Sequence, residues 1–374
     1  MKLPTGWKET TLSEIFEFEK KSGVKAGEGE NIGKYKFFTS SGMQSKYINS
    51  FTFDGEYLIF GTGGQASIHY CKEKFSTSTD CFVVGVSKVV LPKYVYYFIK
   101  SKMYLLEEGF KGAGLKHISK EYIKNIKIVF PETKETQNKI VSLIEKVEKL
   151  QEKKEKANKL SILYIQNLFR KMFGDPVNNE KKWGQVSLGE ICEIKTGGTP
   201  SRKENAYWGG DIPWVKTTEL RGSVIHTAQE TITKMGEQNS NATVFPKDTI
   251  LVAMYGQGKT MGRTAKLGIN AATNQACAAL LPSKSCETEF IWQYLILSYD
   301  QLRKLAKGGN QPNLNLKILR DFKIYDPPLK LQKDFSTISE TMRNLNQNQI
   351  KSQVEINHLF NSLIEKAFSG KLVM

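Results

Sequence analysis

The stretch WKETTLSEIFE at residues 7–17 recurs in altered form as WGQVSLGEICE at residues 183–193. The two stretches share Trp, Leu, Glu, Ile and Glu, and each of these residues recurs 176 positions after its first occurrence (183 minus 7). Farther along, the spacing between matching residues is 196 (327 minus 131), so the second copy carries about 20 extra residues in its middle. The later matches are Ile118, Ile123, Ile126, Ile128 and Pro131 with Leu314, Leu319, Phe322, Ile324 and Pro327. A repeat of this length indicates a duplicated domain rather than a solenoid unit.

Each copy ends in a long stretch with helical spacing, opened by Pro131 in the first copy and by Pro327-Pro328 in the second, as suits a first helical turn. Apolar residues recur in alternating steps of four and three, which predicts the seam of a coiled coil. The predicted seam positions are Thr136, Ile140, Leu143, Val147, Leu150, Lys154, Ala157, Ser161, Tyr164 and Leu168, and Leu331, Phe335, Ile338, Met342, Leu345, Gln349, Ser352, Ile356, Leu359 and Leu363.

Two helices of about 40 residues, roughly 60 Å long, are expected to pair and to hold two heads apart. Lys154 and Gln349 lie inside the seam, where polar residues set the register of a coiled coil. Apolar residues outside the seam predict further burial against partner proteins. They are Ile144, Ile162, Phe169, Phe360 and Phe368.

The heads, about residues 1–130 and 183–325, mix short β-rich runs with helices. Strands are expected at residues 56–60 and 249–254, and helices at residues 94–106 and 290–305. The predicted fold is α+β: two similar α/β domains separated by two long antiparallel coiled-coil helices in a duplicated, pseudo-twofold chain. The predicted divisions are a first head at 1–130, a central helix at 131–175, a second head at 176–326 and a C-terminal helix at 327–374.

The charge balance favours a polyanionic partner. Lysine and arginine outnumber aspartate and glutamate by 54 to 38, for a net charge of +16. A merely soluble basic protein is the alternative that charge alone leaves open. Five scattered cysteines without a C-x-x-C pair indicate neither a disulfide framework nor a zinc ribbon. With no apolar leader and no membrane-spanning run, we expect a cytoplasmic protein that does not contact a membrane.

Glycine-rich polar loops lie between the predicted strands, at residues 61–65, 196–202 and 255–260. Glycine permits close approach of a backbone to phosphate, and Gln, Asn, Arg and Lys side chains can read base edges in the major groove. Ordinary tight turns are the alternative for each loop.

Specific motifs resemble the type I restriction-modification specificity subunits over essentially the whole chain. They are the head openings Gly6-Trp7-Lys8 and Lys182-Trp183-Gly184, each followed by Leu-x-Glu-Ile, the loop Thr196-Gly197-Gly198-Thr199-Pro200-Ser201, Pro213-Trp214-Val215, residues 308–314 (GGNQPNL) and the helix end at residues 363–370 (LIEKAFSG). The first head departs from this pattern, with Lys20-Lys21-Ser22-Gly23 in place of the glycine loop and residues 112–115 (GAGL) in place of GGNQPNL.

The resemblance implies a DNA-recognition subunit without catalysis of its own. Each target recognition domain of the family reads one half of a split DNA site, and two different heads imply an asymmetric target. The helices of the family dock two adenine methyltransferase subunits, and the assembly can add restriction and translocase subunits. S-adenosylmethionine and ATP would bind to those partners, so this chain itself is expected to hold no cofactor and no metal.

Candidate DNA contacts follow from the loops that the family turns toward the duplex. In the second head they are Thr199, Ser201, Arg202, Lys216, Tyr255, Gln257, Lys259, Asn310 and Gln311. In the first head they are Lys20, Lys21, Lys25, Gln44, Gln65 and Lys116. For each of them a solvated surface role is the alternative.

Two short motifs would point to an enzyme instead. Residues 253–260 (AMYGQGKT) fit a permissive phosphate-loop pattern, but residues 261–268 contain two glycines and no amphipathic helix to face phosphates. Asp326-Pro327-Pro328-Leu329 resembles an adenine methyltransferase tetrad but lacks its aromatic residue. His69, His117, His226 and His358 show no metal-ligand spacing. A two-headed DNA-binding regulator that acts without methyltransferase partners is the second alternative.

Overall fold

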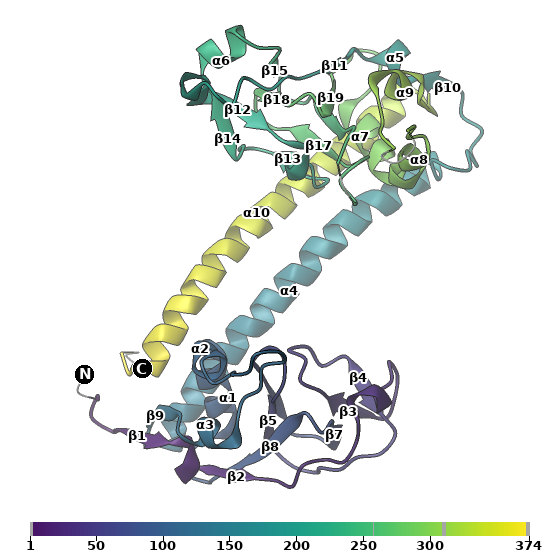
Figure 1. The fold of residues 1–374 in the computed structure, drawn as a ribbon. Coiled ribbons are helices and arrows are strands. Elements are labelled where there is room, and N and C mark those ends of the chain that lie inside the picture. The colour runs from purple at the N-terminus through teal and green to yellow at the C-terminus, as the bar shows by residue number, and fades with distance from the viewer. Residues whose placement is uncertain (1–2, 257, 309–311, 372–374) are drawn as a thin grey trace. The chain divides into compact units, whose positions relative to one another are not determined.

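The computed structural model describes residues 3–256, 258–308 and 312–371, and the chain divides into two compact units. Unit 1 comprises residues 1–155 and 351–374, and unit 2 comprises residues 156–350. Two helices of 40 residues, α4 (Lys134–Phe173) and α10 (Leu329–Phe368), each contribute one half to each unit (Figure 1). Each unit therefore consists of one head and two helical segments.

The head of unit 1 is α+β. Strand β1 (Trp7–Thr11) pairs antiparallel with β9 (Lys127–Pro131), which brings the two ends of the head together. A four-stranded sheet has the order β2-β8-β5-β6, and a three-stranded sheet has the order β4-β3-β7. Their bounds are β2 Phe16–Phe18, β3 Tyr35–Phe38, β4 Lys46–Ile48, β5 Tyr57–Gly61, β6 Ser67–Cys71, β7 Phe75–Thr77 and β8 Cys81–Val86; the helices are α1 Pro92–Ser101, α2 Tyr104–Glu107 and α3 Lys120–Lys124.

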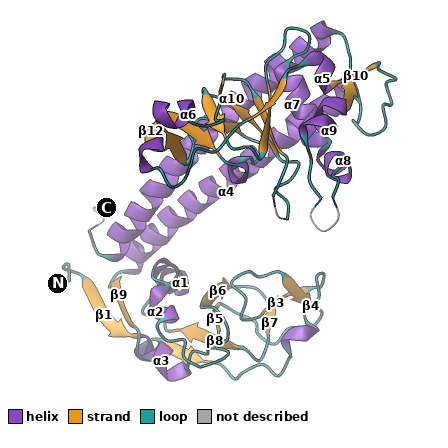
Figure 2. Ribbon diagram, turned by 45° about the horizontal axis from the view of Figure 1, so that its top comes forward, coloured by secondary structure: helices purple, strands orange, loops and turns teal. Residues whose placement is uncertain are grey.

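The head of unit 2 repeats this plan with an insertion. Figure 2 shows the helices and strands of this head. Strand β10 (Gln185–Ser187) pairs with β20 (Lys323–Tyr325), and the two sheets have the orders β11-β19-β16-β17-β13 and β14-β12-β18-β15. The strands are β11 Ile194–Thr196, β12 Trp208–Val215, β13 Val224–Ile225, β14 Glu230–Ile232, β15 Val244–Phe245, β16 Ile250–Ala253, β17 Thr264–Leu267, β18 Ala271–Thr273 and β19 Cys277–Leu280; the helices are α5 Leu188–Ile191, α6 Lys234–Gln238, α7 Thr288–Leu297, α8 Tyr299–Lys304 and α9 Leu316–Asp321.

The sheet pairing supports the duplication that the sequence predicts. Order β2-β8-β5-β6 matches β11-β19-β16-β17, and the parallel pair of β3 with β7 matches that of β12 with β18. The second head adds a parallel pair of β13 with β17. Strand β13, helix α6 and strand β15 have no counterpart in the first head, and they lie in the part of the second head where the repeat spacing increases.

The head helices differ from the prediction because each is interrupted. The predicted helix at 94–106 is α1 followed by α2, and that at 290–305 is α7 followed by α8. Ser298 ends α7 with a ψ of 13°, and it is completely buried. The chain turns there and places Leu302 in the core.

The end of each long helix is anchored by a phenylalanine in a head core. Phe173 at the end of α4 lies 4.8 Å from the ring of Phe290 in unit 2. Phe368 at the end of α10 lies 5.3 Å from the ring of Tyr94 in unit 1. These pairs occupy equivalent places, 195 and 196 positions apart (368 minus 173 and 290 minus 94).

A buried glutamine fixes the start of each long helix. Gln137 donates from Nε2 to the Pro131 carbonyl (2.8 Å) and accepts at Oε1 from the Leu91 amide (2.8 Å). Gln332 repeats both contacts with the Pro327 carbonyl (2.8 Å) and the Glu287 amide (3.0 Å). Pro131 itself is the last residue of β9, and α4 begins at Lys134, so the expectation that Pro131 opens the helix was wrong.

The helices pair antiparallel, as predicted. In unit 1, Gln151 Nε2 donates to Asn357 Oδ1 (2.8 Å), and Lys154 Nζ donates to Ser352 Oγ. The residue farther along α4 contacts the residue earlier along α10, so the two helices run in opposite directions. In unit 2, Phe169 and Phe173 of α4 pack on Phe335 of α10.

One half of the predicted seam is displaced by one residue. Buried or half-buried positions at 140, 147, 154, 161 and 168 agree with the prediction, as do 335, 342, 349, 356 and 363. In the other half, the residues one later than predicted are buried or half-buried, at 137, 144, 151, 158 and 165 and at 332, 339, 346, 353 and 360, and the predicted Thr136, Leu143, Ala157, Leu331 and Ser352 are half-buried too. Leu150, Tyr164, Ile338, Leu345 and Leu359 are exposed instead. Each helix packs against a head as well as against the other helix, so the most apolar neighbour is not always the buried one.

Most of the apolar residues outside the predicted seam are buried within the chain's own units. Ile144, Phe169 and Phe368 belong to the cores of the heads, and Phe360 packs partly against the first core. Ile162 alone of the five is exposed, at 50%. Burial against partner proteins is therefore not needed to explain the other four.

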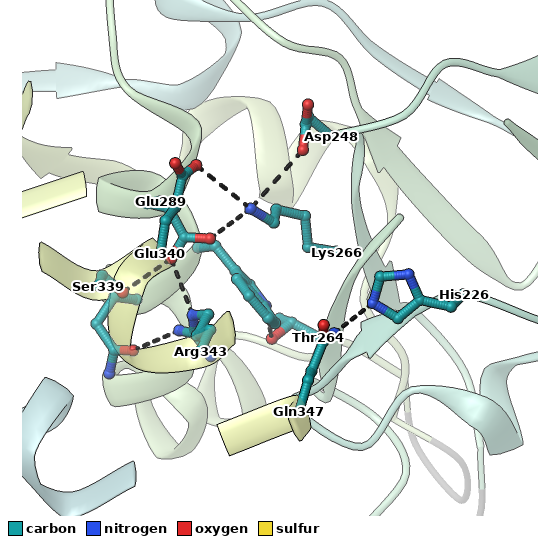
Figure 3. A network of polar contacts seen from close by, with 11 residues as sticks. His226, Asp248, Thr264, Lys266, Glu289, Ser339, Glu340, Arg343 and Gln347 are labelled. Atoms are coloured by element: carbon teal, nitrogen blue, oxygen red, sulfur yellow. Dashed lines mark hydrogen bonds and ion pairs between the residues drawn. The ribbon is translucent and has the colours of Figure 1, made fainter. Parts of the chain in front are cut away.

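A buried ionic network joins the head of unit 2 to α10 (Figure 3). Glu289 of α7 is 1% exposed and contacts Lys266 Nζ of β17 at 2.5 Å and Arg343 Nε of α10 at 2.9 Å. Ser339 Oγ donates to the same carboxylate at 3.0 Å. Burial opposes ionisation of Glu289, but Arg343 and Lys266 outweigh it and keep the pKa of the carboxyl below its usual value.

At two equivalent positions in unit 1 the charges are reversed: Lys93 stands at the place of Glu289, and Glu148 stands at the place of Arg343 (343 minus 148 is 195). Lys93 and Tyr97 of α1 stand 196 positions before Glu289 and Gln293 of α7 (289 minus 93). Lys93 Nζ contacts Glu145 Oε1 of α4 at 2.5 Å, and Tyr97 OH donates to Glu148 Oε2 at 2.6 Å. Each head helix therefore carries the charge that complements its own long helix.

Candidate nucleic-acid interface

A charged cluster on the second head contains two of the predicted DNA contacts. Arg202 and Lys216 share the carboxylate of Glu230 in β14, at 2.6 and 2.5 Å. The hydrogen bonds from Lys216 and then from Arg202 lower the pKa of Glu230 below its usual value. The Arg202 guanidinium also lies 3.6 Å from the ring centroid of Trp208. Stacking and ion pairing hold its planar donor edge in a defined orientation.

Two tryptophans fasten the loop that carries Thr199 and Ser201. Trp214 Nε1 donates to the Gly198 carbonyl (3.0 Å), and Trp208 Nε1 donates to the Ser201 carbonyl (3.1 Å). Thr199 Oγ1 donates to Gln275 Oε1 (2.5 Å), whereas Ser201 is exposed. The loop is thus held against the head, and its tip faces solvent.

The glycines of this loop serve packing within the head. A Cβ at Gly197 would lie 2.0 Å from the Thr273 carbonyl oxygen, and a Cβ at Gly198 would lie 2.3 Å from the Asn241 carbonyl carbon. Both glycines are buried. The absence of a side chain therefore permits close approach to the chain's own backbone, and approach of this loop to phosphate stays a prediction.

Replacing Gly198 by alanine is expected to lower the free energy of unfolding of unit 2 by about 1 to 3 kcal/mol, because backbone atoms of Asn241 cannot rotate away from the new methyl group. Urea unfolding followed by tryptophan fluorescence measures it, since Trp183, Trp208, Trp214 and Trp292 lie in this unit. The control is Gly184→Ala, where a Cβ meets no atom within 4 Å. Equal stability of the two variants would contradict the packing role.

Tyr255 and Lys259 lie on the loop between β16 and β17, and both are exposed. The Met254 amide donates to the Ala276 carbonyl (2.8 Å), and Gln275, the preceding residue, contacts Thr199. The segment at residues 273–276 therefore connects the two loops of predicted contacts in the second head. Gln257, Asn310 and Gln311 lie outside the described residues.

Hydrogen bonds connect the loops of the first head that carry its predicted contacts. The Gly64 amide donates to the Lys116 carbonyl (3.0 Å), which joins the loop of Gln65 to that of Lys116. Ser40 Oγ accepts from the Gly63 amide (3.3 Å) and donates to the Asp80 carbonyl (2.8 Å). The Thr79 amide donates to the Val24 carbonyl (2.9 Å), which adds the loop of Lys20, Lys21 and Lys25.

These predicted contacts in the first head differ in exposure. Lys20, Lys21, Lys25, Gln65 and Lys116 are exposed. Gln44 is half-buried, and its Nε2 donates to the Lys46 carbonyl (2.5 Å), so its amide is partly engaged within its own loop. Hydrogen bonds thus join the loops that carry these six residues, and their contact with DNA stays a prediction.

Sequence reasoning missed Glu230, Gln275 and the stacking partner Trp208. The two tryptophans near Arg202, at positions 208 and 214, were a signal for a stacked arginine. Glu230 had no such signal, because only the pairing of β12 with β14 brings it to Lys216.

The enzyme-like motifs do not form their expected sites in the described residues. Residues 258–262 form turns that lead into β17, so no helix follows the phosphate-loop-like motif. In the Asp326 tetrad, the Asp326 amide donates to the Gly184 carbonyl (2.9 Å), and α10 begins at Leu329. The described residues contain no group of three metal-ligating side chains, and all five cysteines are free and buried.

Fold and loops together define a class of protein: a duplicated chain with two heads, each of which gathers polar and cationic loops suited to nucleic acid. No helix among the described segments is long and apolar enough to cross a membrane. The family model for the type I restriction modification DNA specificity domain matches residues 4–161 and again residues 180–356.

Similar proteins agree with this match. The specificity subunit of the type I restriction enzyme MjaVIII from Methanocaldococcus jannaschii is 23% identical over 100% of this chain and 94% of the relative. The EcoDI specificity subunit from Escherichia coli is 23% identical over 99% of this chain and 90% of the relative. For the MjaIX specificity subunit from M. jannaschii, the identity is 28% over 47% of this chain and 41% of the relative. A crystal structure of a type I system S subunit from M. genitalium has a TM-score of 0.73 at 18% identity and covers 98% of both chains.

The chain belongs to the type I restriction-modification DNA specificity family. The resemblance and the α+β, two-headed fold expected from the sequence are confirmed. The assignment as a DNA specificity subunit is confirmed as well, and the regulator alternative receives no support.

Proposed function

We propose that each head reads one half of an asymmetric, bipartite DNA site. The observation that carries this proposal is that two heads of one topology present different loop side chains. The second head offers Arg202, Lys216 and Tyr255, whereas the first offers Lys20, Lys21 and Gln65. Lysines would grip phosphates without regard to sequence, and a held arginine such as Arg202 would suit bidentate contact with guanine.

The long helices would carry the partners. Each bears large apolar side chains on its exposed face, among them Leu150 and Leu160 on α4 and Leu345 and Leu359 on α10. Exposed apolar surface of this kind favours protein contact. Two adenine methyltransferase subunits would dock there, and restriction and translocase subunits would join the assembly. In this proposal the partners bind S-adenosylmethionine and ATP, and the chain itself acts without catalysis, metal or cofactor in the cytoplasm.

The test is to co-express the chain with the methyltransferase subunit encoded beside it and to map N6-methyladenine across the genome by single-molecule sequencing. Methylation is expected at one asymmetric split motif and is expected to vanish without this chain. Exchange of residues 183–325 for the head of a relative should change one half of the motif only. The incoming head should keep an acid and a base at positions 289 and 266, because Arg343 of α10 remains in place.

Each outcome distinguishes the alternatives. A motif that changes in both halves after the exchange would contradict one head per half-site. Absence of chain-dependent methylation, with tight DNA binding by the chain alone, would favour the regulator.

A further inference from the structure

The second head contains a cavity of 540 Å³ whose charged lining is entirely cationic among the described residues. Arg221, Lys259 and Arg263 line it, together with Ile296 and Tyr299 at the junction of α7 and α8. No aspartate or glutamate belongs to the lining. The cavity adjoins the predicted DNA-contacting loop, since Lys259 belongs to both.

The three cations lack the partners that other cations of this head have. Arg202 and Lys216 share Glu230, and Lys266 contacts Glu289. The Arg221 and Arg263 guanidinium groups and the Lys259 ammonium group form no ion pair with any residue that the structure describes. Like charges around one cavity repel each other, and an anion in the cavity would relieve that repulsion.

Hydrogen bonds hold the walls of the cavity in place. Tyr299 OH donates to the Lys259 carbonyl (2.7 Å), and Arg303 NH1 donates to the Met261 carbonyl (3.0 Å) and to Tyr299 OH (3.2 Å). The Gly222 amide donates to the Thr264 carbonyl (2.8 Å), which joins the loop of Arg221 to β17. The cations therefore project from a braced frame rather than from a free loop.

The first head does not repeat this arrangement. By the spacing of 196 that relates β6 to β17, Ser67 stands at the place of Arg263 (263 minus 67). By the same spacing, Glu107 of α2 stands at the place of Arg303 of α8. An acid in the first head thus replaces a base that braces the cationic cavity in the second.

We propose that this cavity binds a phosphate of the DNA backbone beside the second half-site. The inference rests on the proposed function and adds to it a contact that positions the duplex without reading its sequence. Guanidinium groups match phosphate oxygens in bidentate geometry, and such contacts weaken as salt rises because counterions are released. Arg221 and Arg263 would hold the backbone, while Arg202 reads base edges.

The experiment measures the affinity of the full chain for duplex DNA by fluorescence anisotropy across a series of salt concentrations. Duplexes with and without the methylated motif are compared. In Arg221→Gln/Arg263→Gln, the slope of log affinity against log salt is expected to become shallower by about 1, because one phosphate contact contributes about 0.9. The loss of affinity should be the same for both duplexes. Arg221→Lys/Arg263→Lys should restore the slope, since it restores the charges.

The control removes two exposed lysines of the same unit, Lys284→Gln/Lys333→Gln, and should leave the slope unchanged. If the salt slope of Arg221→Gln/Arg263→Gln equalled that of the wild type, the phosphate contact at this cavity would be overturned, and the proposed function would stand. Failure of the wild-type chain to bind either duplex would overturn the proposed function as well. A fluorescent ATP analogue tests free nucleotide as the source of phosphate: its binding to wild type and not to the variant, with an unchanged DNA slope, would overturn the DNA assignment.

Discussion

Replacing Glu289 by alanine is expected to lower the free energy of unfolding of unit 2 by about 3 to 5 kcal/mol. Lys266 and Arg343, whose side chains are 8% and 16% exposed, would lose the carboxylate that they share. Asp248 and Glu340 stand 3.7 and 3.8 Å from Lys266 Nζ, but both are about half exposed, so they compensate only in part. Removal of one partner from a buried pair leaves the other charges desolvated and uncompensated, which is why this effect is large.

The measurement combines urea unfolding with amide hydrogen exchange in β17, α7 and the first half of α10. The matched control is Lys93→Ala at the equivalent position of unit 1, where the ion pair with Glu145 is 38% and 30% exposed. That control is expected to cost about 1 kcal/mol or less, because solvent screens the pair. Equal losses in the two variants would show that burial of the network does not set its contribution.

The reversed charges give each head a preference for its own helix. With the second head placed on α4, Glu289 would face Glu148, which stands at the place of Arg343 (343 minus 148 is 195). Like charges brought together in a partly buried contact are costly, so the two heads are not interchangeable on the helices even though their topologies match. The residues that match each head to its own long helix are therefore different from the candidate DNA contacts.

The sequence predicted the duplication and the long helices because both leave periodic signals. It misplaced half of the seam because periodicity cannot tell which of two adjacent residues, such as Leu345 and Asn346, is buried when a helix has two partners. It could not show that Gly197 and Gly198 are needed for packing, because the contacts of their loop with Thr273 and Asn241 join residues far apart in sequence. The cluster of Arg202, Lys216 and Glu230 likewise forms only when distant strands pair.

Phe368 closes the fold of unit 1, and its replacement by alanine is expected to lower the free energy of unfolding of that unit by about 3 to 5 kcal/mol. Its ring is 2% exposed and packs on Tyr94 at 5.3 Å and on Phe98 at 5.5 Å. The equivalent Phe173 lies within the continuous segment 156–350 that forms unit 2. Phe368, in contrast, lies in a separate segment, residues 351–374, that joins the rest of unit 1. Loss of the anchor should therefore release a helical end as well as open a cavity.

Amide hydrogen exchange at residues 351–368 tests this release, and exchange there is expected to rise far more than in α1 or β8. The control is Leu359→Ala on the same helix, where the side chain is 69% exposed and the expected change is within about 0.5 kcal/mol. If Phe368→Ala destabilised the unit but left exchange in the helix unchanged, Phe368 would contribute to the core without holding the end of α10. If both variants released the helix, attachment would depend on the helix's own stability rather than on its buried face.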